Sequence, residues 1–110
     1  MSEKPRMKIP ESAKRAAKRA LEIRKELPPS QRAMTPVGLA RASQLIREDT
    51  ISLDDAREIR AFLERHKIDK QSKEFKEKGW SSKGGQSLLG WGGLGWLPAL
   101  VSFVEANRGK

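Results

Sequence analysis

The chain has 110 residues, a mass of 12.4 kDa, a formal net charge of +9, a single histidine and no cysteine. This length allows one modest hydrophobic core and excludes two. Without cysteine there are no disulfides and no thiolate zinc sites, and one histidine excludes the usual multi-histidine metal centres. We therefore expect no bound metal, and nothing in the sequence points to a cofactor. The charged N-terminus is not followed by an apolar run, so we expect no signal peptide and a cytoplasmic location.

The positive charge is concentrated in the two flanks of the chain. Residues 1–32 hold ten basic against four acidic residues, residues 33–69 six against seven, and residues 70–110 seven against three. A neutral centre with basic flanks is expected when a compact core carries arms that bind a polyanion. The alternative is a surface kept soluble by lysine, but such surfaces usually intersperse acids among the lysines. The distribution therefore favours nucleic-acid binding.

After a basic tail over residues 1–9, the composition predicts a helix near residues 10–27. It is rich in alanine and long charged side chains, Pro10 suits its start, and Pro28 with Pro29 ends it. Its apolar stripe is narrow, so the helix can pack closely but buries little area. Basic residues lie around the other side, on a ridge able to follow phosphates, namely Lys14, Arg15, Lys18, Arg19 and Lys25.

A second helix is predicted near residues 35–47. Thr35 is suited to be its N-cap, and Pro36 to be its first helical residue. Gly38 just inside the helix indicates a close approach, either by a neighbouring helix, which is the commoner reason, or by a ligand backbone. We expect Arg41 to be partly buried, with an internal ion pair to Glu48, Asp49 or Glu58 as the simplest role.

A third helix is predicted near residues 52–67. Apolar residues recur at a spacing of three and four, Ser52 is well placed as the N-cap, and two aspartates follow in the first turn. The far end of this helix carries an unusual polar group made by Arg65, His66 and Asp69.

His66 and Asp69 are three residues apart and can meet if the helix continues past His66. Such a pair can orient an imidazole as a general base, but no nucleophile lies nearby, so we predict that the protein is not an enzyme. The favoured role is structural, with His66 at the helix C-terminus and Asp69 binding Arg41 or Arg65. The alternative is an anion pocket made by Arg60, Arg65 and His66.

Residues 70–78 are rich in lysine and are expected to form a solvated connector or a short exposed helix. The next stretch, residues 79–96, holds seven of the nine glycines and all three tryptophans, and we predict an irregular segment, with a short helix possible around 86–90. Trp91 and Trp96 are expected to cover the core. The last helix is predicted near residues 97–107, with Pro98 at its start.

Residues 39–70, LARASQLIREDTISLDDAREIRAFLERHKIDK, resemble a small domain encoded by many tailed bacteriophages. That domain has an Ala-Arg-Ala helix, a capped helix ending in Phe-x-x-Arg-His-x-x-Asp, and a Trp-Gly-Gly segment, which Trp91, Gly92 and Gly93 match here. The likeness extends upstream to residue 9. This chain departs from the pattern at Leu94, where the family has an acidic residue, and at Trp96, which comes early. The resemblance implies a phage origin, a place in the host cytoplasm or the virion, and association with virion or DNA-processing proteins, and it supplies no enzymatic activity to carry over.

We therefore expect an all-α domain over residues 10–110, a small bundle of about four helices with an irregular Gly/Trp-rich segment before the last. The leading function is a phage-encoded nucleic-acid-binding accessory module, with DNA as the first candidate partner and weak sequence specificity. The alternative is a virion or assembly protein that docks on another phage protein through the Gly/Trp segment. A membrane span over the uncharged residues 84–104 is a minor third possibility, because its six glycines and its proline disfavour a continuous helix in lipid. The expected nucleic-acid contacts are Lys14, Arg15, Lys18, Arg19, Lys25, Arg41, Arg60, Arg65, His66, Lys70 and Lys73.

Overall fold

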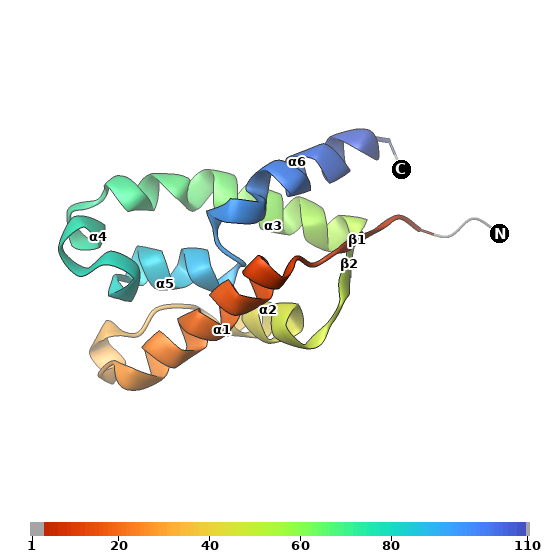
Figure 1. Cartoon of the computed structure of the whole chain (residues 1–110). Coiled ribbons are helices and arrows are strands. Elements are labelled where there is room, and N and C mark those ends of the chain that lie inside the picture. Colours follow the sequence, from red (N-terminus) through yellow and green to blue (C-terminus); the bar gives the residue numbers. More distant parts are fainter. Residues whose placement is uncertain (1–3, 110) are drawn as a thin grey trace.

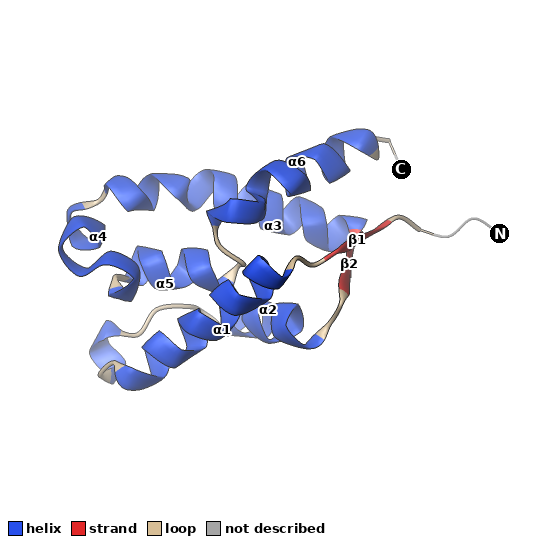
Figure 2. Ribbon diagram, viewed as in Figure 1, coloured by secondary structure: helices blue, strands red, loops and turns tan. Residues whose placement is uncertain are grey.

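A computed structural model describes residues 4–109 and confirms the all-α prediction, with more helices than the four expected (Figure 1). Helices dominate the described chain, and the only strands in it are two short ones that form a two-stranded sheet (Figure 2). In chain order the elements are β1 (Arg6–Lys8), α1 (Glu11–Glu26), α2 (Pro36–Arg47), β2 (Thr50–Ser52), α3 (Leu53–His66), α4 (Lys73–Lys78), α5 (Lys83–Gly90) and α6 (Leu97–Ala106).

Side-chain caps start α2 and α3 where the sequence predicts them. The Thr35 hydroxyl accepts a hydrogen bond from the Gly38 N–H at 3.2 Å, and the Ser52 hydroxyl accepts one from the Asp55 N–H at 3.1 Å. Each cap satisfies an N–H that has no partner within its own helix. Serine also caps α4 and α5, at Ser72 and Ser82. The connector 70–78 thus ends in a short exposed helix, one of its two predicted forms.

The short helix allowed around 86–90 within the irregular segment 79–96 does form, but it begins earlier, because α5 occupies residues 83–90 and lies between α1 and α3 (Figure 1). Two of its glycines come directly after its start, and a side chain there would collide with neighbours: a Cβ on Gly85 would lie 2.7 Å from the Gly79 carbonyl oxygen. Glycine is therefore needed for close packing. The buried alanines of α1, Ala13, Ala17 and Ala20, likewise allow α1 to pack closely on α5 and α2.

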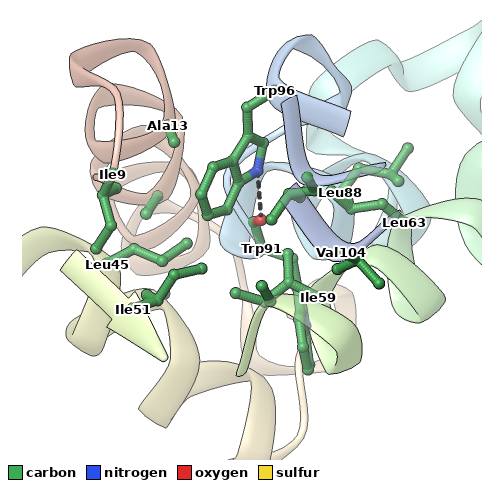
Figure 3. Close-up of a cluster of buried hydrophobic side chains, with 14 of the residues drawn as sticks. Ile9, Ala13, Leu45, Ile51, Ile59, Leu63, Leu88, Trp91, Trp96 and Val104 are labelled. Carbon is green, nitrogen blue, oxygen red and sulfur yellow. Dashed lines mark hydrogen bonds between the residues drawn. The ribbon is translucent and has the colours of Figure 1, made fainter. Parts of the chain in front are cut away.

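Trp91 and Trp96 lie in the core, as predicted, with 7% and 2% of their surface exposed. The turn between them uses Gly92 and Gly93 at φ of +98° and +79°, where other residues are strained. The Trp96 indole Nε1 donates to the Trp91 carbonyl oxygen at 3.2 Å (Figure 3). Around them Figure 3 shows aliphatic side chains from several elements, including Leu45, Ile59 and Leu88.

Part of the basic tail predicted over residues 1–9 is structured. Residues 6–8 form β1, which pairs antiparallel with β2 so that Met7 lies opposite Ile51. Ile9 follows the strand and is 1% exposed in the core. The strand was not foreseen because three residues with little alternation carry almost no periodic signal. Residues 1–3 lie outside the described residues.

Within residues 4–109, no single helix is both long and apolar enough to cross a membrane. One pair of segments, residues 83–90 with residues 94–106, reaches the length and composition together, with a bend of 44° between them.

Candidate nucleic-acid interface

The basic side chains of this chain fall into two groups according to whether the fold already pairs them. One group makes ion pairs or hydrogen bonds inside the domain, mostly around α2 and α3. The other group has no carboxylate within 4 Å among the described residues and points to solvent from α1 and from the segment after α3. The distinction decides which of the predicted contacts are available to a phosphate.

Lys14 belongs to the paired group, although it was predicted to lie on the phosphate-following ridge of α1. Its ammonium donates to the carbonyl oxygens of Ile46 and Glu48 at the C-terminal end of α2, and lies 3.8 Å from the Asp49 carboxylate. Its side chain is 16% exposed. A cation there satisfies carbonyls that lack partners in the helix and matches the negative end of the helix dipole. Lys14 therefore joins α1 to α2.

Arg41 is buried, as predicted, and its partners are Asp55 and Glu58 on α3, so only Glu58 among the three expected partners is correct. One guanidinium nitrogen of Arg41 lies 3.2 Å from a carboxylate oxygen of Asp55, and the guanidinium also contacts the Glu58 carboxylate and the Gln44 amide oxygen. Its guanidinium lies over the Trp91 ring, 5.1 Å from the ring centroid. Arginine in such a position stabilises through both ion pairs and cation–π attraction.

Asp55 shows the electrostatic result of this arrangement. Partial burial raises its pKa, but hydrogen bonds from Gln44 and Arg41, together with the charge of Arg41, lower it by more. The pKa of the Asp55 carboxyl therefore lies below its ordinary value, and Asp55 remains charged at neutral pH.

The predicted anion pocket of Arg60, Arg65 and His66 does not form. Arg60 pairs with Glu64 at 3.1 Å and with Glu105 of α6 at 2.9 Å. The hydrogen bonds to Glu105 and Glu64 raise the pKa of Arg60, and the same contact from Arg60 lowers the pKa of Glu105. Arg65 is exposed and instead lines a shallow groove with Phe62 and Trp91.

His66 and Asp69 do meet, as predicted, with His66 Nδ1 3.1 Å from Asp69 Oδ2. The expected bond from Asp69 to Arg41 or Arg65 is not among the interactions of the described residues. The imidazole stacks on Phe62 at 4.3 Å between ring centroids, and Phe62 stacks on Trp91 at 4.1 Å, nearly parallel at 9°. Gly38 approaches this column, since a Cβ on it would lie 3.6 Å from Trp91 Nε1. Arg41, Trp91, Phe62 and His66 thus form one continuous column of planar groups, which is buried at Arg41 and Trp91 and partly exposed at His66.

The unpaired group contains most of the other predicted contacts. On α1, Arg15, Lys18, Arg19 and Lys25 are exposed, and none has a carboxylate within 4 Å among the described residues. After α3, Lys73 is equally free, while Lys70 lies 5.6 Å from the centroid of the Trp80 ring.

The fold brings the C-terminal end of α1 and the lysine-rich segment after α3 together at one end of the molecule, here called the basic end (Figure 1). The turn after α1, residues Pro29–Gln31, lies against the segment that contains α4 and the start of α5 (Figure 1). The link is Gln86, which is 0% exposed and hydrogen-bonds to Gln31, Ala33 and Ser81. Sequence reasoning missed Gln86, although a single amide in the stretch GGQSLLG was the signal available.

Comparison with protein-family models, with curated proteins and with solved structures gives no match.

Proposed function

We propose that this protein is a nucleic-acid-binding accessory module, of phage origin as the family resemblance implies, that binds DNA through phosphate contacts. The observation that supports it is the division of the cations. Those on α2 and α3 are largely taken up by carboxylates of the fold, whereas Arg15, Lys18 and Arg19 on α1 have no partner among the described residues. Unpaired cations on a rigid helix can displace counterions from a phosphate backbone.

Sequence specificity should be weak. The exposed side of α1 carries Arg and Lys with serine and glutamate, and has no Asn or Gln set among the arginines to read base edges. Contacts of this kind position a protein on the nucleic acid without specifying a site.

The test is the salt dependence of affinity for duplex and single-stranded DNA. The logarithm of the binding constant should fall linearly with the logarithm of salt, by about 0.9 per phosphate contacted on a duplex and about 0.7 on a single strand. A variant with Arg15, Lys18 and Arg19 all changed to Gln should lower this slope by about two to three on a duplex, with unchanged circular dichroism.

A matched control removes the same charge from cations that are already paired. Arg47, Arg57 and Arg108 lie at 3.9, 3.3 and 3.2 Å from Glu48, Asp54 and Glu105, on the outside of the domain. Changing these three to Gln should alter the slope much less than the α1 variant does. Equal slopes in both variants would mean that only net charge matters, and the α1 face would then have no particular role.

The alternative is a virion or assembly protein that docks through the Gly/Trp segment. Trp91 and Trp96 are buried, so a partner would meet the apolar groove beside them, lined by Leu94, Leu97, Pro98 and Val101 with Glu64 and Lys67 of the α3 side. If wild-type protein binds neither DNA nor RNA at low salt, the nucleic-acid proposal fails and this one replaces it. Binding to a phage protein that survives high salt would support it.

A further inference from the structure

A small polar pocket lies at the basic end, where the turn after α1 meets α4 and the start of α5. Its volume is about 140 Å³, less than half the smallest usual pocket for a drug-sized ligand, about 300 Å³. The size suits one compact group and excludes a nucleoside with its phosphate. The lining residues are Ser30, Gln31, Glu74, Lys78, Ser81 and Lys83.

The walls of this pocket are fixed by the buried amide of Gln86. Its Nε2 donates to the carbonyl oxygens of Gln31 at 3.0 Å and Ser81 at 2.9 Å, and its Oε1 accepts from the Ala33 N–H at 3.0 Å. Both N–H donors of this amide are therefore used, one on the Gln31 side of the pocket and one on the Ser81 side. The pocket is thus a preformed part of the fold, since Gln31 and Ser81 line it from opposite segments.

The side chains that line the pocket offer more donors than acceptors. Among residues 4–109, no carboxylate lies within 4 Å of the side-chain ammonium of Lys78 or of Lys83, and the hydroxyls of Ser30 and Ser81 have no hydrogen-bond partner. The one acid, Glu74, already accepts a hydrogen bond from the Lys83 backbone N–H at 2.7 Å. A ligand that complements this lining must be small, negatively charged and rich in acceptor oxygens.

We propose that this pocket binds a phosphate monoester group. A monoester carries a charge of about −1.5 to −2 at neutral pH and three acceptor oxygens. An internal phosphodiester carries one charge, and two of its oxygens are esterified to carbon. It therefore fits the small pocket less well and complements the two lysines less well. The group could be the terminal phosphate of a nucleic-acid strand or free phosphate. The first source rests on the proposed function and deepens it, because it directs the protein to strand ends.

The experiment compares two single-stranded DNA molecules of one sequence, one ending in a phosphate and one in a hydroxyl. Wild-type protein should bind the phosphorylated strand about tenfold more tightly at low salt, since a charge-assisted hydrogen bond contributes about that factor. In the variant Lys78→Ala with Lys83→Ala the preference should disappear, while the strand that ends in a hydroxyl is still bound.

The control is Lys73→Ala with Lys76→Ala, which removes two charges from the same segment outside the pocket lining. It should keep the preference for the terminal phosphate. All four lysines are exposed, so neither variant should change the fold, which circular dichroism checks. Equal loss of preference in both variants would overturn the pocket and leave a non-specific charge effect.

Inorganic phosphate separates the two sources. When it is titrated into wild-type protein, it should shift the backbone amide NMR signals of Ser81 and Lys83. In the variant Lys78→Ala with Lys83→Ala, the signals of Ser81 and of position 83 should not shift. If it shifts them while neither DNA strand binds, the pocket is a site for free phosphate and the nucleic-acid proposal fails. If both DNA strands bind equally and inorganic phosphate shifts nothing, the pocket proposal fails and the nucleic-acid proposal stands.

Discussion

The centre of the domain and its basic end use the same residue types for different purposes. In the centre, the Arg41 guanidinium lies over the Trp91 ring and pairs with the Asp55 and Glu58 carboxylates, and Lys14 caps the end of α2. On the exposed side of α1 and at the basic end, the ammonium groups of Lys18 and Lys83 have no partner within the described chain. The comparison teaches that the net charge of +9 is a poor guide to binding capacity, because a cation that the fold has already paired releases few counterions.

The largest effect should come from removing the centre of the aromatic column. Trp91→Ala should destabilise the domain by about 3 to 5 kcal/mol, because it leaves a cavity between Arg41 and Phe62. Phe62→Ala should have a similar effect. Chemical denaturation measures it, and Trp80→Ala, which removes a partly exposed ring, is the control. An unchanged melting temperature for Trp91→Ala would show that the column is not part of the core.

Arg41→Ala should cost about 2 to 3 kcal/mol, since it removes charged hydrogen bonds and the cation–π contact. This loss of stability is smaller than for a fully buried ion pair, because the Glu58 side chain is 66% exposed and remains hydrated. Arg41→Lys should recover only part of it, as lysine cannot reach two carboxylates with one planar group. Full recovery in the lysine variant would mean that charge alone matters at this position.

Lys14→Met should lower the stability by about 1 to 2 kcal/mol, because two carbonyls of α2 lose a charged donor. It should leave the salt dependence of DNA binding almost unchanged. Lys18 lies one turn further along α1, on its exposed side. Lys18→Met should leave the stability almost unchanged and reduce the salt dependence of DNA binding. If Lys14→Met instead reduced the salt slope as much as Lys18→Met, the distinction between paired and unpaired cations would be wrong.

The smallest effect depends on pH. Because the pKa of Asp55 is lower in the folded state than the ordinary value of about 3.9, its charge stabilises the fold above that pH, and the contribution is lost as pH falls through the folded pKa. Asp55→Asn should therefore be less stable than wild type at neutral pH, by about 1 kcal/mol for a partly exposed group. Urea denaturation across the acid range should show the two proteins converging below about pH 4. A constant difference down to pH 2 would contradict the ion pair with Arg41.

Local signals in the sequence predicted what local interactions decide. The caps at Thr35 and Ser52 involve N–H groups three residues on, and α1, α2, α3 and α6 begin and end close to their predicted bounds. The contact between His66 and Asp69 follows from the same short spacing.

Long-range contacts were beyond such reasoning. Lys14 binds carbonyls 32 and 34 residues away, so its helix position indicated an exposed cation, and only the packing of α1 on α2 reverses this. Gln86 bonds to residues 53 and 55 positions earlier in the chain. The sequence allowed a helix only from residue 86, and α5 begins at Lys83, because propensity disfavours Gly84 and Gly85 and takes no account of the close packing that requires them.

The small glycine residues of α5 also affect how the domain unfolds. In an exposed helix, replacing glycine with alanine raises stability by up to about 1 kcal/mol, but at Gly85 the backbone of Gly79 and Trp80 stands in the way. An isolated segment with this composition has little reason to be helical, since nucleation is costly and its propensity is low. Helix α5 can therefore exist only while α1 is packed against it. We therefore expect the packing of α1 on α5 to be lost in the same step in which α5 melts.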